Sequence, residues 1–190
     1  IYALLAFDCR GYGIPAADKN AVQTSREGLV KYILDRQLKD GGWAYSGDRA
    51  EPDMTAMALQ ALAAYYKTDA KVKDAVDKAV TCLSKLQNTT GGYDSYGSVN
   101  SESAAQVITA LTALGIDPDN DARFVKNGVS VLDSLCGFYV DGGFRHVSDG
   151  KLDPTATAQG YYALAAYYRF ADSQTALYDM TDLDTVEKAA

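Results

Sequence analysis

The sequence predicts an all-α fold made of repeats of about fifty residues, each with an outer helix, a Gly-Gly-aromatic turn and an inner helix. Three observations predict this fold. The Gly-Gly-aromatic triplet begins at positions 41, 91 and 142, so its intervals are 50 and 51 residues. A polar residue and an Ala-rich, helix-favouring stretch follow each triplet, and an amphipathic stretch precedes it. Such repeats bury their faces against neighbours, so we expect about seven helices in antiparallel pairs around a shared axis.

The inner helices are predicted by their N-terminal residues. Glu51, Asn100 and Asp153 stand where N-caps belong, and Asn and Asp are stronger caps than Glu. Pro52 and Pro154 follow at the first helical position, where a missing N–H costs nothing. We therefore expect three inner helices, which begin directly after Glu51, Asn100 and Asp153.

The outer helices are predicted by apolar stripes with a period near 3.6 residues. The three stripes are Leu29, Val30, Ile33, Leu34 and Leu38, then Val72, Ala75, Val76, Ala79, Val80, Leu83 and Leu86, and finally Phe124, Val125, Val129, Leu132, Leu135 and Cys136. Residues 2–6 match the end of an inner helix.

One domain over residues 1–190 therefore contains a partial repeat over 1–20 and repeats over about 21–68, 69–118 and 119–175. A tail over 176–190 follows, in which a further outer helix is expected to begin at Asp182. The incomplete first repeat and the unfinished tail predict a fragment of a longer protein.

Charge and composition exclude several classes of partner. The net charge of −7 argues against nucleic acid, whose binders need a Lys/Arg face. No apolar run approaches the roughly 20 residues of a transmembrane helix. Cys9, Cys82 and Cys136 lie far apart without metal-ligand spacing, so we expect small buried residues rather than a disulfide framework.

The turns resemble a known motif. Gln37, Gly41 and Trp43 fit Gln-x3-Gly-x-Trp, and Gln87, Gly91 and Tyr93 repeat it with Tyr in place of Trp, whereas the third turn lacks the glutamine. This pattern resembles the QW motif of the prenyltransferase and squalene-cyclase repeat family, over nearly the whole chain. The resemblance implies a partial α/α toroid in which the inner-helix N-termini face one open mouth. It also implies that Trp43, Tyr93 and Phe144 fill the seams between repeats.

Members of the family that this chain resembles carry out three kinds of chemistry, and the residues that each kind requires can be looked for here. Asp53 falls at the position of the proton-donating Asp of terpene cyclases, but Met54 replaces the next carboxylate, and we interpret Asp53 as a partner of the helix dipole. Zinc-dependent prenyltransferases use Asp, Cys and His, whereas the single histidine, His146, is expected to be a surface loop residue. The Cys-Gly-Glu-Gln segment of thioester domains is missing. We expect no metal and no cofactor.

These observations favour a non-catalytic binding or scaffold module of a secreted or cell-surface bacterial protein. Its partner would be a small molecule, a glycan or another domain of the same protein. One alternative is a terpene-cyclase-like enzyme with Asp53 as general acid. Another is a toroidal carbohydrate-active enzyme with paired carboxylates. The candidate contact residues are Tyr45, Glu51, Asp53, Tyr96, Asn100, Glu102 and Asp153.

Overall fold

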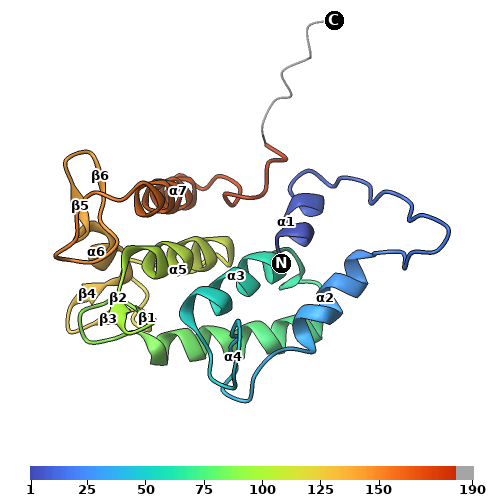
Figure 1. Cartoon of the computed structure of the whole chain (residues 1–190), viewed down its shortest axis with the longest axis horizontal. Coiled ribbons are helices and arrows are strands. Elements are labelled where there is room, and N and C mark those ends of the chain that lie inside the picture. The colour runs from blue at the N-terminus through green and yellow to red at the C-terminus, as the bar shows by residue number, and fades with distance from the viewer. Residues whose placement is uncertain (183–190) are drawn as a thin grey trace, which may run out of the picture.

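The computed structural model describes residues 1–182, and this part of the chain is mostly helical (Figure 1). The predicted helix from Asp182 onward lies outside the described residues except for Asp182 itself. The α-helices are α1 (Tyr2–Asp8), α2 (Arg26–Leu34), α3 (Pro52–Leu62), α4 (Ala70–Leu86), α5 (Ser101–Ala113), α6 (Val131–Cys136) and α7 (Pro154–Ala171), and the 3-10 helix η1 spans Ala63–Tyr65. Three antiparallel hairpins pair β1 (Asp94–Ser95) with β2 (Ser98–Val99), β3 (Val125–Lys126) with β4 (Val129–Ser130), and β5 (Tyr139–Val140) with β6 (Gly143–Phe144).

The helices form two rows. In the inner row, α1 packs on α3, α3 on α5, and α5 on α7. In the outer row, α2, α4 and α6 pack on α1, α3 and α5 respectively. The three hairpins gather near the N-terminal ends of α5 and α7 (Figure 1). The alternation of inner and outer helices follows the predicted order of each repeat.

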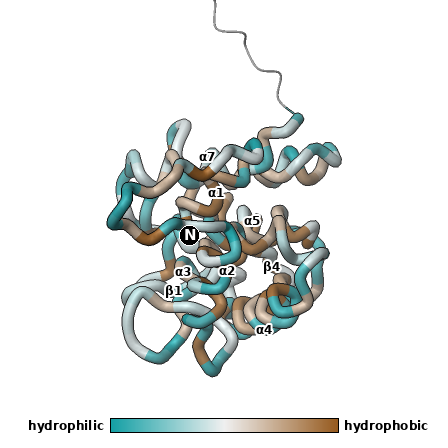
Figure 2. The backbone as a smooth tube through the Cα atoms, turned by 90° about the vertical axis from the view of Figure 1, so that its right-hand side faces the viewer, coloured by the Kyte–Doolittle hydropathy of each residue, from teal (hydrophilic) through white to brown (hydrophobic). Residues whose placement is uncertain are grey.

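The two rows differ in composition because they differ in burial. Helix α5 has helices on both sides and α6 behind it, and eleven of its 13 residues are buried. Helix α4 buries one stripe that includes Val72 and Leu83, while Lys73 and Asp77 form a 2.6 Å ion pair on its exposed face. Figure 2 shows the corresponding hydrophobic and hydrophilic residues alternating along α4. Small residues in the inner row therefore allow close packing on several sides.

The predicted third outer helix is wrong over its first half. Only Val131–Cys136 is helical, whereas Phe124, Val125 and Val129 lie before or within the β3–β4 hairpin. Its turn residues Asn127 and Gly128 have φ values of 52° and 79°. Positive φ at both central residues is typical of a type I′ hairpin turn, for which Asn-Gly is a favoured sequence. The apolar spacing fits a helix, but the Asn-Gly pair determines the local structure.

The other two hairpins use the same kind of turn, and the sequence analysis predicted no strand at all. Tyr96 and Gly97 have φ values of 54° and 88°, and Asp141 and Gly142 have 45° and 84°. Each hairpin has only two residues in each strand. Strands this short carry too little alternation to be recognised from hydropathy.

The cysteines do not all follow the prediction. All three are free thiols in the described structure, but only Cys82 is fully buried, and burial raises its pKa to about 11. Cys9 is half-buried, and Cys136 is exposed because it is the last residue of the short α6. No helix within residues 1–182 combines the length and the apolar character that crossing a bilayer requires.

Candidate functional site

Two glutamines join neighbouring repeats through equivalent hydrogen bonds. Each side-chain amide donates to the carbonyl of its own turn and to a carbonyl in the next outer-row segment, so each ties two repeats together. Gln37 Nε2 donates to Gly41 O and Ala75 O, both at 2.7 Å, and Gln87 Nε2 donates to Gly91 O and Phe124 O, both at 2.8 Å.

The aromatic residues of the three turns are buried, as predicted. Trp43, Tyr93 and Phe144 are 4%, 0% and 1% exposed. The backbone N–H of Trp43 donates to the hydroxyl of Thr55, and that of Phe144 donates to the hydroxyl of Thr157, both at 2.9 Å. Each threonine lies on the inner helix that follows the turn. The Tyr93 hydroxyl is buried without a hydrogen-bond partner. These rings therefore act in packing rather than in ligand contact.

The predicted caps are confirmed for two of the three inner helices. The Asn100 side chain accepts from Ser103 N at 2.9 Å, and the Asp153 side chain accepts from Ala156 N at 2.8 Å. Glu51 also occupies the predicted N-cap position, but its side chain makes no capping bond. Its longer carboxylate instead accepts from Tyr45 N at 3.0 Å. Asn100 and Asp153 are thereby committed to their own helices.

Loops 43–51, 93–100 and 144–153 connect each aromatic residue to an N-cap, and we call them together the rim. Two rim residues reach the first turn of the preceding inner helix. Ser95 Oγ donates to Asp53 Oδ2 at 2.7 Å, and His146 Nδ1 lies 2.8 Å from Glu102 Oε2. His146 is a surface residue, as predicted, with 51% of its side chain exposed. The sequence analysis missed its pairing with Glu102.

The two links occupy equivalent positions. Ser95 and His146 each stand two residues after the buried aromatic of their turn, and Asp53 and Glu102 each stand two residues after an N-cap position. Tyr45 is the corresponding residue of the first turn. An alignment of the three turns on their aromatic residues could have identified this position.

The rim displays two exposed tyrosines. Tyr45 is 81% exposed and Tyr96 is 87% exposed, in contrast to the buried Trp43 and Tyr93 nearby in sequence. Both belong to the predicted contact residues. Of these seven residues, the structure joins Tyr45 and Glu51 through the hydrogen bond described above, whereas Asp53 and Glu102 bond to residues outside the predicted set.

A polar ladder between the inner helices was also missed. Gln60 Nε2 donates to Gln106 Oε1 at 2.9 Å, and Gln106 Nε2 donates to Gln159 Oε1 at 3.1 Å and to the Tyr162 hydroxyl. Gln60 and Gln106 are buried, and this network connects α3, α5 and α7. Buried side-chain networks of this kind fix the relative register of packed elements.

The three acidic residues among the predicted contact residues other than Asp153 are already engaged by protein donors. Glu51, Asp53 and Glu102 each accept from a different residue. Within residues 1–182, no group of three or more His, Cys, Asp or Glu side chains is arranged to hold a metal ion. What the rim offers to a ligand is therefore exposed aromatic surface beside a few polar groups.

Comparisons with protein-family models, with curated proteins and with solved structures gave no match to this chain.

Proposed function

We propose that the chain is part of an α/α toroid of the prenyltransferase and squalene-cyclase repeat type, and that it works as a non-catalytic binding module. Two observations support the toroid: the inner helices pack on one another in sequence order, and Gln37 and Gln87 make equivalent bonds to the next repeat. In this arrangement the rim surrounds the mouth, and its exposed side chains contact the ligand.

Tyr96 carries the proposal. It is 87% exposed, and its φ of 54° lies in the left-handed region, which costs a non-glycine residue about 1–3 kcal/mol. The equivalent turn positions in the other hairpins hold Asn127 and Asp141, whose types tolerate this conformation. A large aromatic side chain kept at such a position, without a packing role, indicates contact with a partner.

Tyr45 supplies a second contact at the first turn. Its ring is 81% exposed, and its backbone N–H is fixed by Glu51, which holds the loop in place. Tyrosine presents a flat apolar face and a hydroxyl group, which suits the ring of a sugar or the surface of a protein. The rim therefore fits a glycan or protein ligand better than a fully apolar one.

The enzymatic alternatives are less well supported. An acid that protonates an alkene needs a protonated carboxyl in a dry cavity. Asp53 instead accepts a hydrogen bond from Ser95 and remains partly exposed. A glycosidase needs two carboxyl groups directed at one sugar. Glu51, Asp53 and Glu102 are each directed at a separate protein donor.

The secreted or cell-surface location remains part of the proposal. Tethering at a surface would present the rim to glycans or to another domain of the same protein.

The proposal can be tested by binding to an array of soluble glycans, with purified surface polysaccharides and mucins as further probes. We expect Tyr96→Ala to weaken binding about tenfold, which corresponds to the loss of about 1–2 kcal/mol at a contact residue. Tyr12→Ala is the matched control, because Tyr12 is 54% exposed but lies in the segment between α1 and α2.

Two results would contradict the proposal. One is equal binding by the wild-type chain and Tyr96→Ala across every glycan bound. The other is turnover of a glycan or an isoprenoid that Asp53→Asn abolishes.

A further inference from the structure

The segment after α7 folds back onto the inner row. Residues 172–182 run from the end of α7 toward α1 (Figure 1), where Met180 N donates to Cys9 O at 2.8 Å. The last described segment thus pairs with the first helix. We call residues 175–182 the fold-back segment.

One arginine holds both ends of the fold-back segment. Arg169 of α7 donates through Nε to Thr175 O at 2.9 Å and through a terminal nitrogen to Asp182 Oδ2 at 2.6 Å. Desolvation disfavours the charged form of Asp182, but hydrogen bonding, including the bond from the Arg169 guanidinium, outweighs it and the pKa of Asp182 is lowered. Between these ends, Thr175 Oγ1 donates to Asp179 O at 2.7 Å. The segment is therefore held in one conformation without regular secondary structure.

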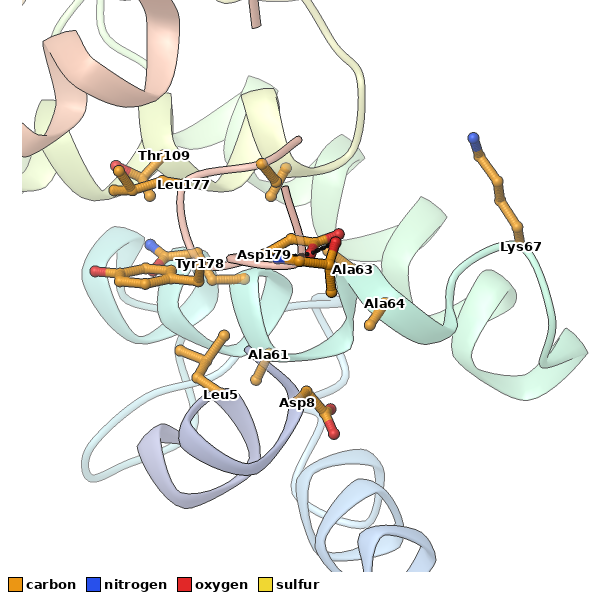
Figure 3. Close-up of a pocket in the computed structure, with 14 residues that line it drawn as sticks. Leu5, Asp8, Ala61, Ala63, Ala64, Lys67, Thr109, Leu177, Tyr178 and Asp179 are labelled. Carbon is orange, nitrogen blue, oxygen red and sulfur yellow. Dashed lines mark hydrogen bonds between the residues drawn. The ribbon is translucent and has the colours of Figure 1, made fainter. Parts of the chain in front are cut away.

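The middle of the segment forms one wall of a pocket of about 380 Å³. Figure 3 shows Leu177, Tyr178 and Asp179 on one side of this pocket, with Leu5 and Ala61 on the other. The remaining inner-row lining includes the small residues Ala63, Ala64, Thr109 and Ala113. Small side chains let an extended backbone approach the helices closely.

Tyr178 is the anchor of the segment. The residue is partly buried. Desolvation raises the pKa of its phenol, and the charge interaction with the nearby Tyr2 raises it further. Aromatic side chains that lose exposure at an interface commonly contribute much of its binding energy. The contacts of Cys9 and of Arg169 Nε, by contrast, are made to peptide backbone, which any extended chain can supply.

We propose that the surface of α1, α3 and α5 that faces the fold-back segment is a recognition site for an extended peptide with a Leu-Tyr pair followed by acidic residues, and that the fold-back segment is the tethered occupant of this surface. Backbone groups at Cys9 and the Arg169 guanidinium bind the main chain, the Leu-Tyr pair faces Leu5 and Ala61 across the pocket, and Arg169 pairs with the acidic end. This site is distinct from the rim, because it is lined by the C-terminal halves of α1, α3 and α5.

The tether determines when an external peptide can bind. A segment joined by a short linker has an effective concentration in the millimolar range, so it outcompetes a free peptide of equal intrinsic affinity. Weakening the tethered copy without touching the receptor residues removes this competition. Affinity for a free peptide must then rise, which a purely structural tail does not predict.

The test uses the full chain and a fluorescein-labelled synthetic peptide of residues 175–182, followed by fluorescence anisotropy. The double variant Leu177→Ala/Tyr178→Ala is expected to bind the peptide at least tenfold more tightly than the wild-type chain. Met180→Ala is the matched control, because its side chain is exposed and its backbone bond to Cys9 is retained. Adding Ala64→Trp to the double variant should abolish binding, because the exposed Ala64 lines the pocket.

Absence of peptide binding by a folded double variant, or equal affinity of that variant and the wild-type chain, would overturn the proposal. If the double variant does not fold, the proposal is tested on the wild-type chain by hydrogen exchange in the presence of the free peptide. Millimolar peptide should then displace the tethered segment and accelerate hydrogen exchange at the Met180 amide. Unchanged exchange at this amide would also overturn it.

Discussion

The next outer-row segment crosses two of the three Gly-Gly-aromatic turns, and no residue of 1–182 crosses the third. A Cβ atom at Gly41 would lie 2.9 Å from Lys78 O, and one at Gly91 would lie 2.6 Å from Ser130 O. A Cβ atom at Gly142 would meet no atom of the described residues within 4 Å. All three glycines nevertheless have similar φ values, between 76° and 94°. The turn conformation and the close approach of a neighbour are thus separate reasons for glycine.

The second glycine of each pair shows no such difference. Cβ atoms at Gly42, Gly92 and Gly143 would each lie 2.5–2.7 Å from a side-chain atom. The first and the second glycine of each pair therefore have different roles. The first accommodates the next repeat where one crosses it, and the second is required for the packing of every turn.

The largest expected effect is the difference in the free energy of unfolding between Gly91→Ala and Gly142→Ala. Both substitutions place a Cβ in the left-handed region, at about 1–2 kcal/mol. Gly91→Ala also drives that Cβ against the Ser130 carbonyl, so we expect a total loss of more than about 3 kcal/mol. Urea unfolding of both variants gives the difference in free energy. Equal losses would mean that the crossing segment yields easily and that the turns are alike.

Loss of the hydrogen bonds that Gln87 and Gln37 make between repeats should have the next largest effect on stability. Gln87→Ala removes the donor to two carbonyls in a buried position, at a cost of about 2–3 kcal/mol. Gln37→Ala should cost less, because Gln37 is only half-buried. The third turn has the buried Phe138 at the corresponding position, so Phe138→Gln should destabilise the chain. Increased stability of Phe138→Gln in the same urea experiment would contradict this account.

The glutamine motif could be recognised in the sequence because its spacing is local, whereas the bonds from the glutamines to the next repeat were not predicted. Four residues separate Gln37 from Gly41, so the side chain can reach the carbonyl of its own turn, and the same holds for Gln87 and Gly91. Inner helices were predictable for a similar reason, since caps and prolines act within one helical turn. The helix after Glu51 also begins where it was predicted, but the longer Glu51 side chain accepts from Tyr45 N outside the helix instead of capping it.

The hairpins and the inter-repeat pairs could not be predicted in the same way. The apolar spacing of residues 124–136 is compatible with a helix, and only the Asn127-Gly128 turn argues otherwise. The Asp53–Ser95 and Glu102–His146 pairs join residues 42 and 44 positions apart. Their formation depends on how one repeat is set against the next, which hydropathy does not encode.

The smallest expected effect lies at these inter-repeat pairs, and it distinguishes the two junctions at the rim. Ser95 is 8% exposed, so Ser95→Ala removes a donor from a shielded carboxylate and should cost about 1 kcal/mol. His146 is far more exposed, and surface pairs contribute about 0–1 kcal/mol, so His146→Ala should change stability less. A double-mutant cycle of each pair, with Asp53→Ala and Glu102→Ala, isolates the two coupling energies. A larger coupling for the His146 pair would show that the exposed link, rather than the buried one, holds the rim together. Because the rim is where we propose that ligand binds, a weak His146 side-chain link would leave the third loop, which the backbone bond from Ser101 N to His146 O still holds, freer than the second to adjust to a partner.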